Sequence, residues 1–450
     1  MKDIDSTIKK SFFKLNFSSE QNLFAGFFIY TFVGCLLLCL PICQKTSVGF
    51  LDNLFMATSA ISTTGLVTIS LYDNYNLLGQ IIITLLIQIG GIGYMTFSSF
   101  VLLSTAQKIS TLRVRVLSTE FTMPTHFNLY QFIRSVIVFT IVIEFIGAIL
   151  FYIAFLQAGV AWDFAIWSAI FHSISTFCTA GFGLYNNSFE NYPTHYFINW
   201  IIIILSYLGA MGFIVLIDVW DRLRGKTKNI TFTSKIIILI TFILSVFGTL
   251  VIFLFEPSVQ KYGIFDGLLI ALFQAMSAMT TVGFNSIPIS TLTTGILLTL
   301  TFLMYVGASP SGTGGGLKST TFTAVIAVVY SRFVGSNKVK FLGKEIPENR
   351  VDVAVSAFIF YTSLVFIGMY LLSFTEKTSL TNILFEVTSA LGTVGLSAGL
   401  TSNLTSFGKC VIIFLMFIGR LGVLTFGIAL LQRNQNNINT QNTEPEDLAV

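Results

Sequence analysis

The sequence contains few charged residues and very few of the residues on which enzymes and disulfide-bonded domains depend. Asp, Glu, Lys and Arg make up 10% of the 450 residues, whereas an ordinary soluble domain has about a quarter. There are three His and five Cys, and no His stands in a pattern with an acid that would suggest catalysis within a membrane. Hydrophobic residues make up 54% of the chain, with 46 Phe. The composition therefore predicts a polytopic membrane protein that is not an enzyme.

The cysteines predict neither a disulfide framework nor a metal site. Cys35, Cys39 and Cys43 are spaced by four residues and would share one face of a helix. No His or carboxylate lies on that face, so we expect these thiols to pack as small hydrophobic groups.

Basic residues are concentrated in alternate connections of the chain, and the formal net charge is +4. Most of them lie in the N-terminal arm and in the loops within 108–134, 222–235 and 332–350. The other connections carry only Lys45, Lys261, Lys377 and Lys409. By the positive-inside rule, both termini and the three basic loops are predicted to be cytoplasmic. Nucleic-acid binding would be an alternative use of basic loops, but no motif accompanies them. The first apolar run lacks a small-residue cleavage site, so we expect a retained helix and not a signal peptide.

A twelve-residue segment rich in Ser, Thr and Gly occurs four times. The copies are FMATSAISTTGL, FHSISTFCTAGF, FQAMSAMTTVGF and FEVTSALGTVGL, at 55–66, 171–182, 273–284 and 385–396. Each copy has Phe at its first place, Ser at its fifth, Thr at its ninth and Gly at its eleventh. A self-similar pattern of this kind indicates a repeat architecture. Each segment is too short to span a bilayer and too polar to face lipid.

Each segment lies between two apolar runs of about the 20 residues that a membrane span requires. The runs that precede the segments are 22–41, 130–157, 235–255 and 351–374, and those that follow are 78–104, 197–220, 293–330 and 407–431. Closely spaced small residues in the second runs would let a helix approach the short segment. We expect an N-terminal arm 1–21, repeats at 22–104, 130–220, 235–330 and 351–431, and a C-terminal tail 432–450.

The predicted fold is an all-α polytopic membrane protein with four helix–pore-loop–helix repeats, which supply eight transmembrane helices and four half-inserted pore helices around one pseudo-fourfold central pore. The start of each segment predicts a short helix, and its Ser/Thr/Gly end predicts extended backbone with the Gly at positive φ. Such backbone is tolerated at membrane depth only where it is buried or lines water. Four copies around an axis would present rings of carbonyl oxygens that can replace the hydration shell of a cation. The alternative is four re-entrant loops with packing roles only.

These segments resemble the selectivity filters of the Trk/Ktr/HKT superfamily of potassium transporters, most of all the KtrB-type membrane subunit of bacterial Ktr systems. The motifs are STTG (62–65), CTAG (178–181), TTVG (280–283) and GTVG (392–395), with GASPSGTGGGLKSTTF (307–322) and FIGRLGVLTFG (417–427). The resemblance covers about 20–431 and implies these potassium-binding filter residues: Ser62, Thr63, Thr64, Gly65, Cys178, Thr179, Ala180, Gly181, Thr280, Thr281, Val282, Gly283, Gly392, Thr393, Val394 and Gly395.

The filter departs from that of potassium channels in one respect. No copy has Tyr-Gly after the Gly, and the residues there are Leu66, Phe182, Phe284 and Leu396. A shorter filter should hold fewer ions and select less strictly. A sodium-permeable HKT-like transporter is therefore the alternative function. In that family a Ser at the first filter Gly is associated with sodium preference, and Gly65 at this position favours potassium.

The second apolar run of the third repeat should be interrupted, because 307–316 contains five Gly and a Pro. The interruption would lie below the filter. The family resemblance implies a mobile gate there, and a static kink is the alternative. A phosphate-binding loop is disfavoured because Leu317 stands where its last Gly is required and no strand precedes it. The expected gate residues are Gly307, Ala308, Ser309, Pro310, Ser311, Gly312, Thr313, Gly314, Gly315, Gly316, Lys318 and Arg420.

Arg420 is expected in the middle of the last span, where an intramembrane charge indicates a functional site. Two unit charges about 6 Å apart repel by roughly 3 kcal/mol at an effective dielectric constant of about 20. Arg420 would therefore limit ion flux below the filter and hold carbonyls of the gate loop. The alternative is a structural pair with Glu144. We expect Glu144 to pair with another helix, Glu386 to pack near the outer mouth, Asp218 and Asp221 to pair with nearby Arg, and Lys318 to reach the cytoplasmic side or a carboxylate.

The resemblance also implies partners and a location. It implies K⁺ as the substrate, Na⁺ as a candidate coupling or activating ion, and no organic cofactor in this chain. It implies a homodimer in the cell membrane and a cytoplasmic ring of nucleotide-binding RCK-type regulatory subunits of the KtrA/KtrC type. The loops are too short to contain a nucleotide-binding fold, so the regulator would be another chain.

Overall fold

The computed structural model describes residues 19–93, 96 and 129–431, which form helices almost throughout. Most of the expected N-terminal arm, most of the basic loop within 108–134 and the tail 432–450 lie outside this part of the chain, so the cytoplasmic placement of both termini stays a prediction.

Each apolar run expected before a twelve-residue segment forms one long helix. These helices are α2 (Ser19–Leu38), α8 (Leu129–Gln157), α12 (Phe232–Phe255) and α17 (Glu348–Ser373). All four are long and apolar enough to cross a membrane. Within the described residues, two bent helix pairs raise the number of such spans to at most six. The predicted eight spans therefore stay a prediction.

The twelve-residue segments begin as short helices, as predicted. The helices are α3 (Phe50–Ile61), α9 (Trp162–Phe177), α14 (Ile264–Thr280) and α18 (Leu380–Gly392). The first three carry an acid in the first turn, namely Asp52, Asp163 and Asp266. A negative charge at this end complements the helix dipole. Each of the four helices ends within its twelve-residue segment, where Thr and Gly leave the helical conformation.

The second apolar runs are broken more often than the sequence suggested. The expected interruption in the third repeat is confirmed, since α15 (Thr294–Tyr305) stops before 307–316 and α16 (Ser319–Phe333) follows it. In the second repeat α10 (Tyr196–Ala210) and α11 (Phe213–Leu223) meet at 98°, and in the fourth α19 (Ser406–Leu421) and α20 (Val423–Leu431) do the same. The expectation of continuous helices there was wrong.

The cause of these breaks is a glycine at the same place in each run. Gly212 and Gly422 both have φ of 86°, and Gly93 at the end of α5 (Leu77–Ile92) has φ of 88°. This conformation is strained for residues with a β-carbon but open to glycine. Arg420 consequently lies in the last turn of α19, just before the bend between α19 and α20.

The remaining elements are short. They are η1 (Pro41–Cys43), α4 (Leu71–Asn74), α13 (Pro257–Gln260), η2 (Ile289–Thr291), η3 (Thr401–Asn403) and the hairpin β1–β2 (Lys340–Phe341 and Lys344–Glu345).

Two of the expected local contacts were wrong. Asp218 accepts hydrogen bonds from the hydroxyls of Thr231 and Ser234, and Asp221 pairs with Lys226 at 3.0 Å, so neither pairs with Arg as expected. Hydroxyl groups at the start of α12 lie nearer to Asp218 than any expected cation. The three cysteines do not share one helix, because α2 ends at Leu38.

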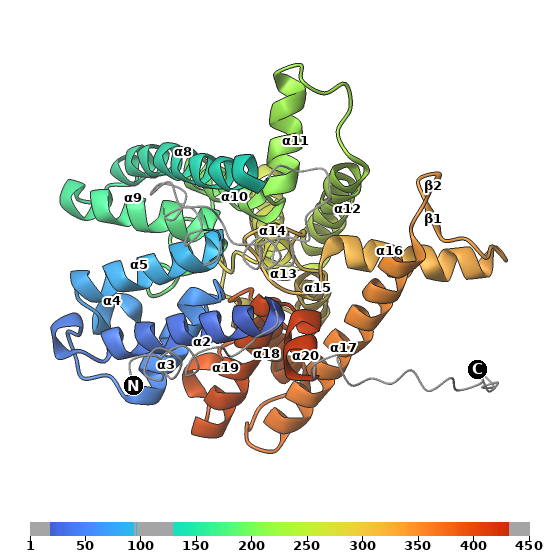
Figure 1. Ribbon diagram of the computed structural model, residues 1–450. Coiled ribbons are helices and arrows are strands. Elements are labelled where there is room, and N and C mark those ends of the chain that lie inside the picture. Colours follow the sequence, from blue (N-terminus) through green and yellow to red (C-terminus); the bar gives the residue numbers. More distant parts are fainter. Residues whose placement is uncertain (1–18, 94–95, 97–128, 432–450) are drawn as a thin grey trace, which may run out of the picture.

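The repeats follow one another around the molecule in order of sequence. In Figure 1 the blue first repeat, the teal second repeat, the yellow-green third repeat and the orange-red fourth repeat surround a common centre. The first and last repeats meet, since Gln21 Nε2 on α2 donates to the Ala429 carbonyl on α20 at 3.3 Å. The ends of the four short helices converge on this centre, where the sequence placed its candidate residues.

Candidate functional site

The fourth-place glycines of the four motifs form a closed ring, and we call Gly65, Gly181, Gly283 and Gly395 the ring glycines. A β-carbon added to Gly65 would lie 3.0 Å from the Cα of Gly181, and one on Gly181 would lie 3.3 Å from the Cα of Gly283. The next two distances, Gly283 to Gly395 and Gly395 back to Gly65, are both 3.1 Å. Each added β-carbon would also overlap a carbonyl oxygen of the next motif. Segments more than a hundred residues apart in the chain therefore meet at one point.

The backbone of the ring has the same conformation in every repeat. The ring glycines have φ of 90°, 66°, 76° and 93°, which confirms the predicted positive φ. The Thr two residues earlier is also left-handed in each repeat, with φ of 52°, 49°, 60° and 50° at Thr63, Thr179, Thr281 and Thr393. Left-handed Thr is strained, because its β-carbon is branched. The surrounding contacts must therefore hold this conformation in place.

Part of that support comes from the short helices. The residue before each ring glycine donates its N–H to the carbonyl of the Ser at the fifth place, with distances of 2.8, 2.8, 3.2 and 2.8 Å in repeats one to four. Small residues on the second helices then let these helices approach closely, as predicted. An added β-carbon on Gly90, Gly209 or Gly419 would overlap the last carbonyls of α3, α9 or α18.

The loop 307–316 lies directly against the ring of left-handed threonines. The Thr63 hydroxyl donates to the Thr313 carbonyl at 3.1 Å, and the Thr179 hydroxyl lies 2.9 Å from that of Thr313. The Gly315 N–H donates to the Thr393 hydroxyl at 2.8 Å. In the remaining repeat, an added β-carbon on Gly314 would overlap the Thr281 hydroxyl. One loop thus contacts all four repeats at the same level.

Two cations hold consecutive carbonyls of this loop. The Arg420 guanidinium donates to the Thr313 carbonyl, to the Thr63 hydroxyl at 3.1 Å and to the Gly90 carbonyl. Lys318 Nζ donates to the Gly314 carbonyl at 2.8 Å and forms no ion pair within the described part of the chain, so the expectation that it reaches a carboxylate was wrong. The four-residue spacing in a tight Gly-rich turn brings the ammonium group back onto its own loop.

A cavity of about 250 Å³ adjoins the loop. Its walls include Pro310, Gly316, Lys318 and Arg420, together with parts of α16, α17, α19 and α20. The loop therefore separates the ring from a hollow space that two cations line. Among the described residues, no group of three or more His, Cys, Asp or Glu could hold a metal ion.

The buried acids Glu144 and Glu386 bind neutral groups. Glu144 on α8 accepts a hydrogen bond from Gln88 of α5 at 3.0 Å, which is the expected contact with another helix. No Arg420–Glu144 pair is among the ion pairs of the described residues. Glu386 on α18 accepts from the hydroxyls of Ser397 and Thr401, beyond the ring.

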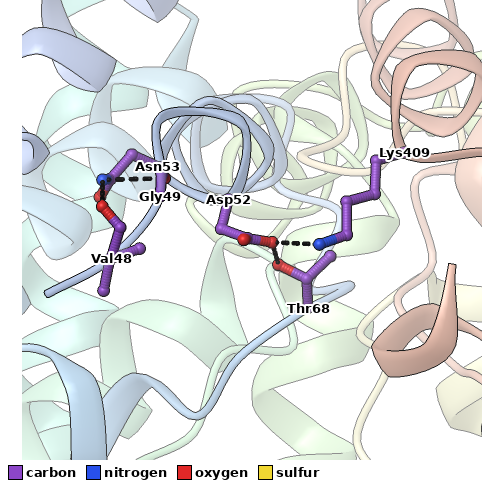
Figure 2. Close-up of polar contacts among 6 residues, drawn as sticks. All are labelled: Val48, Gly49, Asp52, Asn53, Thr68 and Lys409. Carbon is purple, nitrogen blue, oxygen red and sulfur yellow. Dashed lines mark hydrogen bonds and ion pairs between the residues drawn. The ribbon is translucent and has the colours of Figure 1, made fainter. Parts of the chain in front are cut away.

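An ion pair that the sequence did not suggest joins the first and fourth repeats. Figure 2 shows Lys409, in the first turn of α19, donating to Asp52 in the first turn of α3 at 2.6 Å. Asp52 also accepts from the Thr68 hydroxyl at 2.7 Å (Figure 2). Nearby, Asn53 donates to the carbonyls of Val48 and Gly49 (Figure 2). The signal for this ion pair in the sequence was Lys409 itself, a lysine in an otherwise charge-poor connection.

Comparison with known proteins gives relatives over almost the whole chain. The chain is 33% identical to "Ktr system potassium uptake protein B" of Bacillus subtilis, covering 94% of this chain and 95% of that protein. It is 35% identical to "Potassium/sodium uptake protein NtpJ" of Enterococcus hirae, with the same coverage of both.

The fold also has a match among solved structures. The crystal structure of the potassium transporter TrkH from Vibrio parahaemolyticus superposes with a TM-score of 0.68 at 22% identity, over 90% of this chain and 84% of that one. The model of the TrkH family, described as cation transport protein, matches residues 31–440. The chain therefore belongs to the TrkH family of cation transport proteins.

Proposed function

We propose that this protein takes up potassium across the cell membrane. The observation that carries the proposal is the closed ring of four left-handed Thr-x-Gly backbones, with a loop that contacts every repeat on one side. Backbone oxygens arranged around an axis suit a dehydrated monovalent cation. The relatives named for potassium uptake support this choice of ion.

In this proposal the four motifs, 62–65, 178–181, 280–283 and 392–395, are the potassium-binding selectivity filter. Each short helix ends at the filter and directs the negative end of its dipole toward the axis, which stabilises a cation there. Eight membrane-spanning helices would surround this filter as four repeats, and the second helices of repeats two, three and four are broken.

The loop 307–316 is the proposed gate, with Lys318 and Arg420 as the residues that hold it closed. Its contacts with Thr63, Thr179 and Thr393 place peptide groups where a permeating ion would leave the filter. The two cations that hold it also repel K⁺. To open, the loop must exchange these hydrogen bonds for others, which makes it a natural point of regulation.

The regulator belongs to the proposal as well. A cytoplasmic RCK-type ring that binds nucleotides, docked on a homodimer of this chain, would act on the gate from the cytoplasmic side. Sodium is proposed as a coupling or activating ion. The relative named for both potassium and sodium uptake favours a sodium-permeable transporter as the second candidate.

The proposal is tested by growth of a bacterium that lacks potassium uptake, on low potassium, with this chain expressed alone or with a regulatory subunit. The parent should restore growth. Gly283→Ser should abolish it or shift it to at least about tenfold higher potassium, because a side chain at φ 76° would overlap the Val394 carbonyl.

Gly159→Ser is the matched control, because Gly159 also has positive φ, 81°, but an added β-carbon meets nothing within 4 Å. It should grow like the parent. Failure of the parent to restore growth, with the protein present in the membrane and sodium uptake intact, would reject potassium in favour of the sodium-permeable alternative.

A further inference from the structure

The second residue of the twelve-residue segments is different in every repeat. It is Met56, His172, Gln274 and Glu386 in repeats one to four, and all four side chains are completely buried. A buried polar group is stable only when it forms hydrogen bonds. In the three repeats with a polar residue, the partners lie in the chain just beyond the ring glycine. We call these residues, two to six places after each ring glycine, the exit segment, because here the polypeptide chain leaves the ring.

In the second and third repeats the side chain binds backbone N–H groups of the exit segment. His172 Nδ1 donates to the Ser168 carbonyl at 2.7 Å, which leaves Nε2 to accept the Leu184 N–H at 3.3 Å. Gln274, with its amide oxygen turned to the exit segment, accepts the Ser286 N–H at 2.9 Å. Leu184 and Ser286 both lie three residues after the ring glycine, so two unlike side chains hold the same backbone position.

In the fourth repeat a carboxylate holds the exit segment through hydroxyl groups. Glu386 accepts from Ser397 at 2.9 Å and from Thr401. These residues lie two and six places after Gly395. The contact spans the exit segment and fixes it to the middle of α18.

The first repeat achieves the same contact from a different residue. Met56 offers no hydrogen bond, but Asp52 lies one turn earlier on α3 and accepts from Thr68 at 2.7 Å. Thr68 is three residues after Gly65, the position held in the second and third repeats. The acid thus replaces the missing polar group at the second place. In every repeat, one buried or half-buried side chain of the short helix holds the exit segment.

We propose that His172, Gln274, Glu386 and Asp52 are positioning residues that keep the outer end of the filter from contracting around Na⁺. The proposal rests on the proposed potassium uptake and deepens it. Na⁺ is smaller than K⁺, so carbonyl oxygens must move inward to coordinate it well. An exit segment held from behind resists that movement, whether selectivity arises from the size of the site or from the field of its oxygens.

The test uses Gln274→Met in the full-length protein, because Met is the residue that the first repeat already carries at this place. The variant keeps the volume but leaves the Ser286 and Ile287 N–H groups without their acceptor. Uptake of radioactive Rb⁺ into reconstituted vesicles is measured in competition with K⁺ and with Na⁺. The ratio of the Na⁺ concentration to the K⁺ concentration that half-inhibits Rb⁺ uptake should fall about tenfold, which is the effect of one lost net hydrogen bond. Gln274→Glu keeps an acceptor oxygen and should remain within about twofold of the parent.

Gln80→Met is the matched control. Gln80 is also a buried glutamine. Its amide oxygen accepts a hydrogen bond from Trp167 and its amide nitrogen donates to the Tyr75 carbonyl, away from the ring. This variant should keep the parental ratio. If Gln274→Met does not fold, Glu386→Gln is measured instead. This variant replaces a charged acceptor by a neutral one, and hydrogen bonds to charged groups are the stronger ones, so we expect a shift of about threefold.

Each outcome decides between the two proposals. An unchanged ratio in a folded Gln274→Met or Glu386→Gln variant would overturn the positioning role and leave these residues with a stabilising role only. A parent that takes up Rb⁺ but is not inhibited by K⁺ would overturn the proposed function itself. A selective shift in Gln274→Met, absent in Gln80→Met, would support both.

Discussion

Repeats one and four attach their ring glycines to the short helix differently from repeats two and three. In the first and fourth repeats the N–H groups of Gly65 and Gly395 donate to the hydroxyls of Ser59 and Ser389, at 3.1 Å in both cases. These hydroxyls act as acceptors toward the ring.

In the second and third repeats the same serine acts as a donor. Ser175 Oγ donates to the Phe182 carbonyl at 2.7 Å, and Ser277 Oγ donates to the Phe284 carbonyl. The residue after the ring glycine divides the repeats in the same way, with Leu in one and four and Phe in two and three. The comparison teaches that a residue shared by four repeats can form two kinds of contact. The ring is fourfold in its backbone but paired in its side chains.

The contacts between neighbouring repeats divide in the same way. Repeats four and one are joined by Lys409 and Arg420, which lie eleven residues, or about three turns, apart on one face of α19. Repeats two and three have no ion pair between them among the described residues. Asn285 accepts the Phe189 N–H at 3.0 Å, donates its own N–H to Ser188, and donates its side-chain amide to Glu190 at 2.6 Å. No short connection links repeat four to repeat one, and charged groups reach across that boundary.

Removing the charge at the boundary between repeats four and one should have the largest effect. Arg420→Ala should raise potassium flux by about tenfold, because it removes a repelling charge and one anchor of the loop. Initial rates of ⁸⁶Rb⁺ uptake at equal surface expression measure this. Lys409→Ala removes a charge from the same helix face but does not touch the loop, so its rate should stay within about twofold of the parent. A rate for Arg420→Ala that is unchanged or lower would contradict a gating role.

Replacing the serine at the fifth place of the twelve-residue segment should sharpen the difference between repeats one and four and repeats two and three. Ser59→Ala leaves the Gly65 N–H without its acceptor, whereas Ser277→Ala leaves the Phe284 carbonyl without one donor. Unpaired buried N–H groups are less tolerated than under-satisfied carbonyls. We expect Ser59→Ala to lower the free energy of unfolding by about 2 kcal/mol and Ser277→Ala by about 1 kcal/mol. Thermal unfolding of the purified variants checks the order, and equal melting temperatures would remove the distinction.

Breaking the outer ion pair between repeats four and one should have the smallest effect. The Asp52 and Lys409 side chains are 22% and 18% exposed, so Lys409→Met should cost about 1 kcal/mol, more than a surface pair. The control is Lys338→Met, which breaks the exposed pair with Glu345 and should change stability by less than about 0.5 kcal/mol. Thermal unfolding measures both. If both variants melt at the same temperature, the ion pair adds no stability at this boundary.

Much of the fold could be predicted from local pattern alone. Composition and apolar runs predicted the long helices α2, α8, α12 and α17, and the shared columns predicted the short helices with glycines at positive φ. These properties depend on burial of apolar residues and on the steric freedom of glycine, both of which act within a few residues. The breaks at Gly212 and Gly422 were missed, since a glycine in an apolar run does not reveal by its presence whether its φ is positive.

By itself, the sequence determined the four repeats, the interrupted run 307–316 and the unusual charge at Arg420. Only the tertiary structure decided which segments meet: the order of the ring glycines and the contact of one loop with all four repeats. The physical reason is the separation along the chain over which each kind of interaction acts. Helix periodicity and glycine conformation are local, whereas the hydrogen bond from Arg420 to Thr63 joins residues 357 positions apart. Such a contact exists only once the chain has closed into a ring.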